Sequence, residues 1–547
     1  MKTLLIIFSV LLFGCAGQRP PTGGDFDTTP PEIINYSPEN LTTNAKIDKI
    51  ILEFNEYVDK RSVEESIFIS PRINNYDFEW DGKTLEIILK EELQNNVTYV
   101  LRIGTDVVDL NNRNRMEKSF SLAFSTGPKI DNGVIHGKVY GEQNDGITIF
   151  AYRNLNFDTL KISKIPPNFI TQTGKDGTFE FTNLANGNYR IFAVKDEFRN
   201  LLYDTETDEI GISQNNILLT TPSSVSQFIS FILFKEDTTK PRLIDVESVD
   251  KTKLKLIFSE PISDKALEKS IFYLLNIKNE KIKNYSSPLL SKNSKEILLF
   301  DNFVEENFKI KVENIYDLFG NEINELISDK EVKLSNSIDT IKPEIIFSNL
   351  NDNHLEKEDV IVLQFNEKIS YDGSGTKIIK NEIIEIPFDY QFHLPSTIKI
   401  FPKENNSNDS YKLILNSKSI TDLSGNNLKD SILIFNFNYI DDDKYGSIKG
   451  IVKQTSNIFK KVVIVLEKIG EKQKFYSSKI DERNEFSFER VLSGEYKLTY
   501  FIDENENLIF DKGKLFPFIH SEKYYEHNSK IKIRANWPLE GLILNLF

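Results

Sequence analysis

The sequence predicts an all-β protein built from a row of small β-sandwich domains. Three observations carry this prediction. Short alternating strands recur throughout the 547 residues, polar turn residues separate them, and two kinds of internal repeat divide the chain. Alternation places one set of side chains in a core and the other in water. Units of roughly 100 residues with short strands and frequent turns are typical of β-sandwiches.

The first fourteen residues have the pattern of an export signal. Lys2 supplies a positive charge, and residues 4–13 form the apolar run LLIIFSVLLF. This run is shorter than the roughly 20 apolar residues of a transmembrane helix and matches the apolar part of a secretory signal peptide. We therefore expect residues 1–14 to be removed, and residues 15–26, which are rich in Gly, Pro and Thr, to form a tether.

Cys15 is the only cysteine of the chain, which excludes an internal disulfide and a cysteine-ligated zinc ion. It follows Leu12, Phe13 and Gly14, a sequence that resembles the lipobox of bacterial lipoproteins, although Phe13 is larger than the usual residue. The resemblance implies that Cys15 carries acyl chains of the palmitate type. Two or more such chains attach a protein stably to a membrane. We therefore expect a lipid-anchored protein that does not cross the membrane.

The first repeat occurs three times and contains three motifs. It opens with Asp-Thr-x-x-Pro, continues with an apolar strand that ends in Phe-x-Glu, and closes with a turn that begins Asp-Leu. The motifs stand at Asp27–Pro31, Phe54–Glu56 and Asp109–Asn112; at Asp237–Pro241, Phe258–Glu260 and Asp317–Asn321; and at Asp339–Pro343, Phe365–Glu367 and Asp422–Asn426. We assign these units to residues 27–130, 237–338 and 339–441.

The three units resemble the bacterial Ig-like family of S-layer and other envelope proteins, which implies an Ig-like sandwich and indicates little about function. A glutamate that recurs in all three units could be catalytic. It could equally belong to the fold, for example by accepting backbone N–H groups of a neighbouring loop. The repetition favours the structural interpretation, and Asp commonly begins turns. The residues concerned are Glu56, Glu260, Glu367, Asp109, Asp317 and Asp422.

The second repeat occurs twice, with no insertion across its block. Its pattern, Phe-x-Phe followed by Gly-x-Tyr, covers Phe179–Tyr189 and Phe486–Tyr496. A Gly-x-x-x-Gly pair precedes each copy. The pattern is similar to the transthyretin-like modules of carboxypeptidase regulatory domains, which implies transthyretin-like sandwiches at residues 133–236 and 445–547. Because the linkers are short, we expect tandem Ig-like and transthyretin-like β-sandwiches in a beaded, semi-rigid rod.

The chain lacks common catalytic motifs such as a Walker loop, H-E-x-x-H or G-x-S-x-G. Its net charge of −15 argues against nucleic-acid binding. These features favour a non-enzymatic cell-envelope lipoprotein that acts as a structural spacer or protein-interaction module. The alternative is a glycan-binding accessory lipoprotein of a polysaccharide-uptake system, because some of the aromatic side chains could form an exposed platform.

The combination of anchor and domains resembles outer-membrane lipoproteins of the Bacteroidota. In that group, acidic residues directly after the lipidated cysteine accompany export to the cell surface. Here Ala16 to Arg19 follow Cys15, and the first acidic residues are Asp25 and Asp27. We therefore expect an anchor in the outer membrane that faces the periplasm rather than the cell surface, with envelope proteins or glycans as partners.

Two loops of the second repeat carry oxygen side chains at spacings found in calcium-binding loops. Calcium prefers carboxylate and amide oxygens that converge from one loop. The first loop lacks the usual turn glycine and closing glutamate, so we predict weak Ca²⁺ binding there and weaker binding at the second loop. The alternative is a polar loop whose Asp and Asn side chains bind their own backbone. The predicted ligands are Asp503, Asn505, Asn507 and Asp511, and then Asp196, Asn200 and Asp204.

Overall fold

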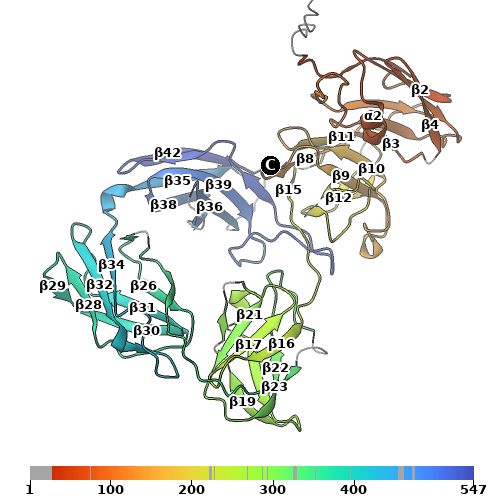
Figure 1. Ribbon diagram of the computed structural model, residues 1–547. Coiled ribbons are helices and arrows are strands. Elements are labelled where there is room, and N and C mark those ends of the chain that lie inside the picture. The colour runs from red at the N-terminus through yellow and green to blue at the C-terminus, as the bar shows by residue number, and fades with distance from the viewer. Residues whose placement is uncertain are drawn as a thin grey trace, which may run out of the picture. The chain divides into compact units, whose positions relative to one another are not determined.

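The computed structural model describes residues 27–547 except 74, 221–224, 227, 268, 286–287, 292, 325–328, 352, 395, 454–460, 471–474 and 547. Cys15, the expected signal at 1–14 and the tether at 15–26 lie outside the described residues. The chain is almost entirely β, which confirms the predicted fold class (Figure 1). No helix in the described part of the chain has the length and apolar character needed to span a membrane.

In the described part of the chain, buried apolar side chains form five clusters, each drawn from one stretch: 33–124, 135–231, 243–332, 350–439 and 448–546. We number the sandwiches around these cores from first to fifth. The chain forms two compact units. One contains the residues up to Tyr203, Ile210–Leu233 and Leu515–Ser521, and the other contains Asp204–Glu209, Phe234–Lys514 and Glu522–Phe547. The first two cores lie in the former unit and the other three in the latter.

The first, third and fourth sandwiches contain the first repeat. The first has β1 Ile33–Ser37, β2 Lys49–Phe54, α2 Lys60–Ser66, β3 Ile67–Ser70, β4 Tyr76–Asp81, β5 Thr84–Leu89, β6 Thr98–Ile103 and β7 Phe120–Ser125. The third has β16 Leu243–Ser248, β17 Lys253–Phe258, α3 Asp264–Leu267, β18 Ile271–Leu275, β19 Lys281–Tyr285, β20 Leu289–Leu290, β21 Glu296–Phe300, β22 Asn307–Glu313 and β23 Asp329–Lys333. The fourth has β24 Ile345–Ser348, β25 His354–Leu355, β26 Ile361–Phe365, β27 Ser370–Tyr371, β28 Thr376–Lys380, β29 Ile384–Ile386, β30 Phe388–Leu394, β31 Thr397–Pro402, β32 Ser410–Asn416, η3 Ser417–Ser419, β33 Ile420–Thr421 and β34 Ile432–Tyr439.

One sheet has the same order in all three of these sandwiches: β1-β2-β5-β4, β16-β17-β21-β20 and β24-β26-β31-β30. Its second strand ends in the Phe-x-Glu motif and pairs with the strand that follows Asp-Thr-x-x-Pro. Alternate residues of this strand fill the core, so that Ile50, Leu52 and Phe54 have no exposed surface. The glutamate therefore stands just past the end of a buried strand, next to the opening segment.

β6 has β22 and β32 as its counterparts in the other two sandwiches, and the alternating strands of the sequence are expected to place one side-chain set in the core and the other in water. The counterparts do alternate, but every residue of β6 is buried. Its outer face is covered by the second sandwich, which lies in the same compact unit. The Arg102 guanidinium donates to the hydroxyls of Thr171 and Thr182 at 3.4 and 3.2 Å. Burial lowers the pKa of Arg102 to about 10.

The second and fifth sandwiches contain the second repeat. The second has β8 Gly133–Tyr140, β9 Thr148–Arg153, η1 Phe157–Thr159, β10 Phe169–Gln172, β11 Thr178–Leu184, β12 Gly187–Lys195, β13 Glu209–Ile212, β14 Ile217–Leu219 and β15 Ile229–Ile232. The fifth has η4 Asp442–Lys444, β35 Tyr445–Lys453, β36 Val462–Lys468, β37 Phe475–Lys479, β38 Glu485–Leu492, β39 Gly494–Ile502, β40 Tyr524–Glu526, β41 Ile531–Ile533 and β42 Pro538–Asn545.

These two sandwiches share one topology. Their smaller sheets are β11-β8-β15 and β38-β35-β42, and the last strand of each pairs in parallel with the strand that carries Gly-x-x-x-Gly. The second glycine of each pair explains the motif. A Cβ at Gly137 would lie 2.1 Å from the Ile229 carbonyl oxygen, and a Cβ at Gly450 would lie 2.5 Å from the Phe486 ring. Only glycine therefore fits between the neighbouring strands.

Candidate functional site

Each sandwich of the first repeat holds three carboxylates close together, which we call an acidic triad. In each triad, one oxygen from every residue lies within 4.8 Å of the other two. One residue comes from Asp-Thr-x-x-Pro, one from Phe-x-Glu and one from the closing turn. The first triad is Asp27, Glu56 and Asp109; the second is Asp237, Glu260 and Asp317; the third is Asp339, Glu367 and Asp422.

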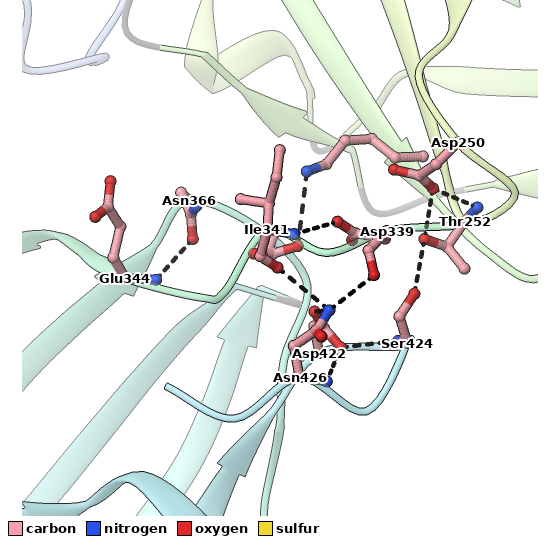
Figure 2. Close-up of polar contacts among 11 residues, drawn as sticks. Asp250, Thr252, Asp339, Ile341, Glu344, Asn366, Asp422, Ser424 and Asn426 are labelled. Carbon is pink, nitrogen blue, oxygen red and sulfur yellow. Dashed lines mark hydrogen bonds and ion pairs between the residues drawn. The ribbon is translucent and has the colours of Figure 1, made fainter. Parts of the chain in front are cut away.

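The turn aspartate organises its own loop. Oδ1 of Asp422 accepts the backbone N–H groups of Ser424 and Asn426, both at 2.8 Å, and Oδ2 accepts the Asn426 side-chain amide at 2.7 Å (Figure 2). Asp317 makes the same three kinds of bond. In the first sandwich, Asp109 accepts the Asn112 N–H and the Asn114 amide. These bonds agree with the structural interpretation of the repeated aspartates.

The same turn also holds the opening segment of the sandwich. The Asn426 amide donates to the Asp339 carbonyl oxygen at 3.1 Å, and the Asn321 amide donates to the Asp237 carbonyl oxygen at 2.8 Å. In the first sandwich Asn114 donates to the same carbonyl of Asp27 at 3.0 Å. Each triad therefore forms where the chain enters a sandwich, because the closing turn is fastened to that point.

The glutamate of each triad lies beside the two aspartates. Accepting backbone N–H groups of a neighbouring loop was one example of a structural role for the glutamate, and the residue before it makes these bonds. Asn55 Oδ1 accepts the Glu32 N–H at 2.8 Å, and Asn366 Oδ1 accepts the Glu344 N–H at 2.9 Å. The glutamate side chain instead lies beside the two aspartates. Oε1 of Glu56 and Oε1 of Glu367 are buried and have no hydrogen-bond partner among the described residues.

This placement disfavours the ionised form of the glutamates. Burial, followed by repulsion from the two aspartates, raises the pKa of Glu260 to about 6. Burial raises the pKa of Glu367 to about 7, although Lys253 acts in the opposite direction. Burial and then the charges of Asp109 and Asp27 also raise the pKa of Glu56. Burial and nearby like charges both disfavour the ionised form of a carboxyl group, so the glutamates hold their protons more tightly than exposed glutamates do.

The third triad has a built-in cation. Lys253, the first residue of β17 in the third sandwich, places Nζ 3.6 Å from Oε2 of Glu367 in the fourth. The two residues are 7% and 1% exposed. Beside them, the Thr252 and Ser424 hydroxyls lie 3.5 Å apart across the same contact (Figure 2). In the described part of the chain, no carboxylate of the first or second triad has an ion pair of this kind.

The predicted calcium loop at Asp503 is held by bonds to its own backbone. Asp503 is 1% exposed, and its two oxygens accept the N–H groups of Asn507 and Leu508, both at 3.0 Å. Oδ1 of Asn507 accepts the Ile509 N–H at 2.7 Å. The amides of Asn505 and Asn507 both donate to Asp511 Oδ2. The side-chain oxygens of the two asparagines thus face backbone donors, and Ca²⁺ binding here stays a prediction.

The second predicted loop repeats this arrangement with fewer residues. Asp196 accepts the N–H groups of Asn200 and Leu201 at 3.2 and 2.8 Å, and Asn200 Oδ1 accepts the Leu202 N–H. The Asp204 backbone N–H donates to the Asp208 carboxylate at 2.9 Å. The sequence reasoning singled out these loops but did not combine the repeated carboxylates into triads. The recurrence of all three acidic positions in each copy of the first repeat was the signal that could have revealed the triads.

Several solved structures resemble the chain at low similarity. The major pilin subunit BcpA of Bacillus cereus is 13% identical, with 54% of this chain and 98% of the pilin covered and a TM-score of 0.15. The Bacillus anthracis TIE protein is 11% identical, with coverages of 96% and 75% and a TM-score of 0.13. The N-terminal part of the bacterial S-layer protein SbsC is 15% identical, with 37% of this chain covered and a TM-score of 0.16. This chain spans only 45% of that S-layer fragment. TM-scores this low carry no argument about the whole chain.

A search of curated proteins found no match. The match to a protein family concerns the first sandwich, and it includes all three residues of the first triad. Residues 27–126 match the family described as "Bacterial Ig-like domain".

Proposed function

We propose that the chain is a non-enzymatic lipoprotein of a bacterial cell envelope that acts as a structural spacer or protein-interaction module. The observation that carries the proposal is the presence of five separate hydrophobic cores among the residues that the structure describes. Each sandwich buries its own apolar surface and has a core of its own. A series of such domains offers side-chain surface to partners, as a spacer or interaction module requires. A bacterial Ig-like domain at residues 27–126 fits such a module.

Contacts between consecutive sandwiches support the role of a spacer, since a spacer must resist bending. In one compact unit, Arg102 of the first sandwich bonds to Thr171 and Thr182 of the second. In the other, Arg490 of the fifth sandwich forms an ion pair with Glu358 of the fourth at 2.6 Å. These contacts join side chains of consecutive sandwiches, as expected for a spacer.

The anchor is part of the proposal and rests on the sequence. An acylated Cys15 would hold the chain in the outer membrane, and the late first acidic residue favours the periplasmic side. The partners would then be other envelope proteins or glycans, and nucleic acid is not among them. The acylated cysteine lies just ahead of the first sandwich, so the series of domains begins close to the membrane surface.

Cell fractionation tests the anchor. The wild-type chain is expected in the membrane fraction, and Cys15→Ala is expected in the soluble fraction with unchanged folding. Retention of Cys15→Ala in the membrane fraction would refute a lipid anchor at this residue. Proteinase treatment of intact cells then tests the facing, because a periplasmic chain is protected and a surface-exposed chain is degraded.

An activity screen tests the non-enzymatic role. The purified chain is expected to show no turnover against panels of glycoside, ester and peptide substrates. The triads bring three carboxylates together, so Glu260→Gln and Glu367→Gln are the matched variants. A turnover that either substitution abolishes would overturn the proposal.

A further inference from the structure

We propose that the cleft between the first and second sandwiches binds a sugar that carries a carboxylate, with a uronic acid as the representative ligand. Both sandwiches lie in the same compact unit. The cleft has a volume of about 690 Å³, and ligand pockets commonly measure about 300–1,000 Å³. The inference deepens the proposed interaction module and rests on it, because it names one class of partner for that module and the site that would bind it.

Side chains from both sandwiches line this cleft, and most of them are polar. The charged ones comprise three cations and three anions, so the net charge of the lining gives no preference for either sign. One of the six differs from the others, because Arg102 is buried and the other five are exposed. These five are Glu117, Lys118, Lys175, Asp176 and Glu180. The preference for an anion therefore depends on Arg102.

Arg102, which lies on β6, has no counter-ion. Its guanidinium is 8% exposed and donates to the neutral hydroxyls of Thr171 and Thr182. The charge of Glu180 favours the protonated guanidinium, but no carboxylate among the described residues forms an ion pair with it. Burial lowers the pKa of Arg102 only to about 10, so the group stays charged at neutral pH.

A carboxylate from a ligand would supply what this group lacks. A buried charge without a charged partner is costly. The planar guanidinium matches a carboxylate with two parallel N–H bonds. Because Arg102 lines the cleft, the carboxylate of a bound ligand can approach it from there.

The hydrogen bonding of the cleft indicates what else the ligand must carry. Thr105 Oγ1, His136 Nδ1 and Gln172 Oε1 are buried and have no hydrogen-bond partner among the described residues. All three residues line the cleft, so small rotations of their side chains would bring these atoms to a ligand. A hydroxyl such as that of Thr105 donates and accepts, whereas the Gln172 oxygen only accepts.

An acidic sugar meets these needs together. Its hydroxyls donate as well as accept, so they can serve Gln172 Oε1 as well as the Thr105 hydroxyl. An inorganic anion supplies acceptors alone and would leave Gln172 Oε1 without a donor. The half-buried ring of Phe228 also lines the cleft, and its negative face suits the C–H groups of a sugar ring.

The experiment measures sugar binding by the purified full chain. Oligomers of galacturonate, glucuronate and mannuronate are titrated into the protein by calorimetry at about 0.15 M salt, which screens non-specific attraction. Maltotetraose is the matched neutral probe, and a tetra-aspartate peptide is the matched acidic probe without sugar hydroxyls. We expect at least one uronate oligomer to bind, and both of the other probes to bind at least tenfold more weakly.

Three variants assign the binding to the cleft. Arg102→Gln removes the charge and keeps an amide donor, and it should weaken uronate binding at least tenfold. Arg61→Gln is the matched control, because this arginine of the same sandwich has a side chain that is 86% exposed and lies outside the cleft. Ser119→Trp places a large ring in the cleft from an exposed position and should also weaken binding. Circular dichroism checks folding, and Ser119→Trp alone decides if Arg102→Gln does not fold.

The proposal is overturned if no uronate oligomer binds, or if maltotetraose or tetra-aspartate binds as tightly. It is also overturned if the folded cleft variants bind uronate as the wild type does. These results would not affect the lipid anchor of the proposed function, because the fractionation of Cys15→Ala tests that anchor without involving the cleft.

Discussion

Lys253→Met should weaken the fourth sandwich strongly at pH 8 and much less at pH 5 when divalent cations are absent. The side chains of Lys253 and Glu367 are 9% and 2% exposed, and their charged atoms are 3.6 Å apart. Removing one partner of a buried ion pair costs about 3–5 kcal/mol, because the other charge stays buried without compensation. We expect a loss of this size at pH 8, where Glu367 is mostly ionised in the wild type.

The dependence on pH follows from the pKa of Glu367, which burial raises from its ordinary value of 4.5 to about 7. The folded state holds this proton more tightly than the unfolded state. This tighter proton binding stabilises the folded state by about 3 kcal/mol at low pH. The contribution is complete below pH 4.5 and is lost as the pH rises through about 7. In Lys253→Met the pKa rises further. At pH 5 Glu367 is protonated in both proteins, so the variant loses little stability there.

Hydrogen exchange measured by mass spectrometry gives the local opening free energy of peptides that contain β26, after correction for the intrinsic effect of pH. Lys255→Met is the matched control on the same strand. Lys255 pairs with Glu247 at 2.6 Å, but these side chains are 27% and 47% exposed, and such surface pairs contribute about 0–1 kcal/mol. An equal loss at pH 5 and pH 8, or a loss no larger than that of the control, would refute the reasoning.

The other predictions concern the positions that hold the sandwiches together. Gly450→Ala should destabilise the fifth sandwich by roughly 3 kcal/mol or more, because the added carbon overlaps neighbouring atoms, whereas exposed Lys449→Ala should have little effect in calorimetric melting. Tyr496→Phe should cost about 1 kcal/mol in the same assay, since it removes the 2.7 Å bond from the Tyr496 hydroxyl to the Leu492 carbonyl oxygen. Asn426→Ala should release the segment at Asp339 and speed its cleavage in limited proteolysis, and an unchanged cleavage rate would count against the role of the turn.

The repeated motifs predicted the fold class because their spacing reflects local structure. Alternating residues around Phe54 lie in the core, and the recurring glycines mark places where strands approach too closely for any side chain. The Asp-Leu turns could be interpreted from sequence because Asp binds nearby backbone N–H groups. These are properties of a few consecutive residues, and so a single sequence contains them.

The triads could not be predicted in the same way, because they depend on contacts between distant segments. Nothing near Glu56 in the sequence indicates that Asp27 and Asp109 lie beside it. In the same way, the sequence does not show that Asn55 rather than Glu56 accepts the Glu32 N–H. Likewise, the burial of β6 results from packing against the second sandwich, which the alternation of its own residues does not show.

The central claim is that the chain is a lipid-anchored module, and the intact mass of the mature protein tests it most directly. The protein is extracted from membranes with detergent, and its mass is measured together with that of its N-terminal peptide. The account predicts a chain that begins at Cys15 and carries two or three acyl groups, in line with the need for more than one chain for stable attachment. An unmodified Cys15, or a chain that begins elsewhere, would contradict it.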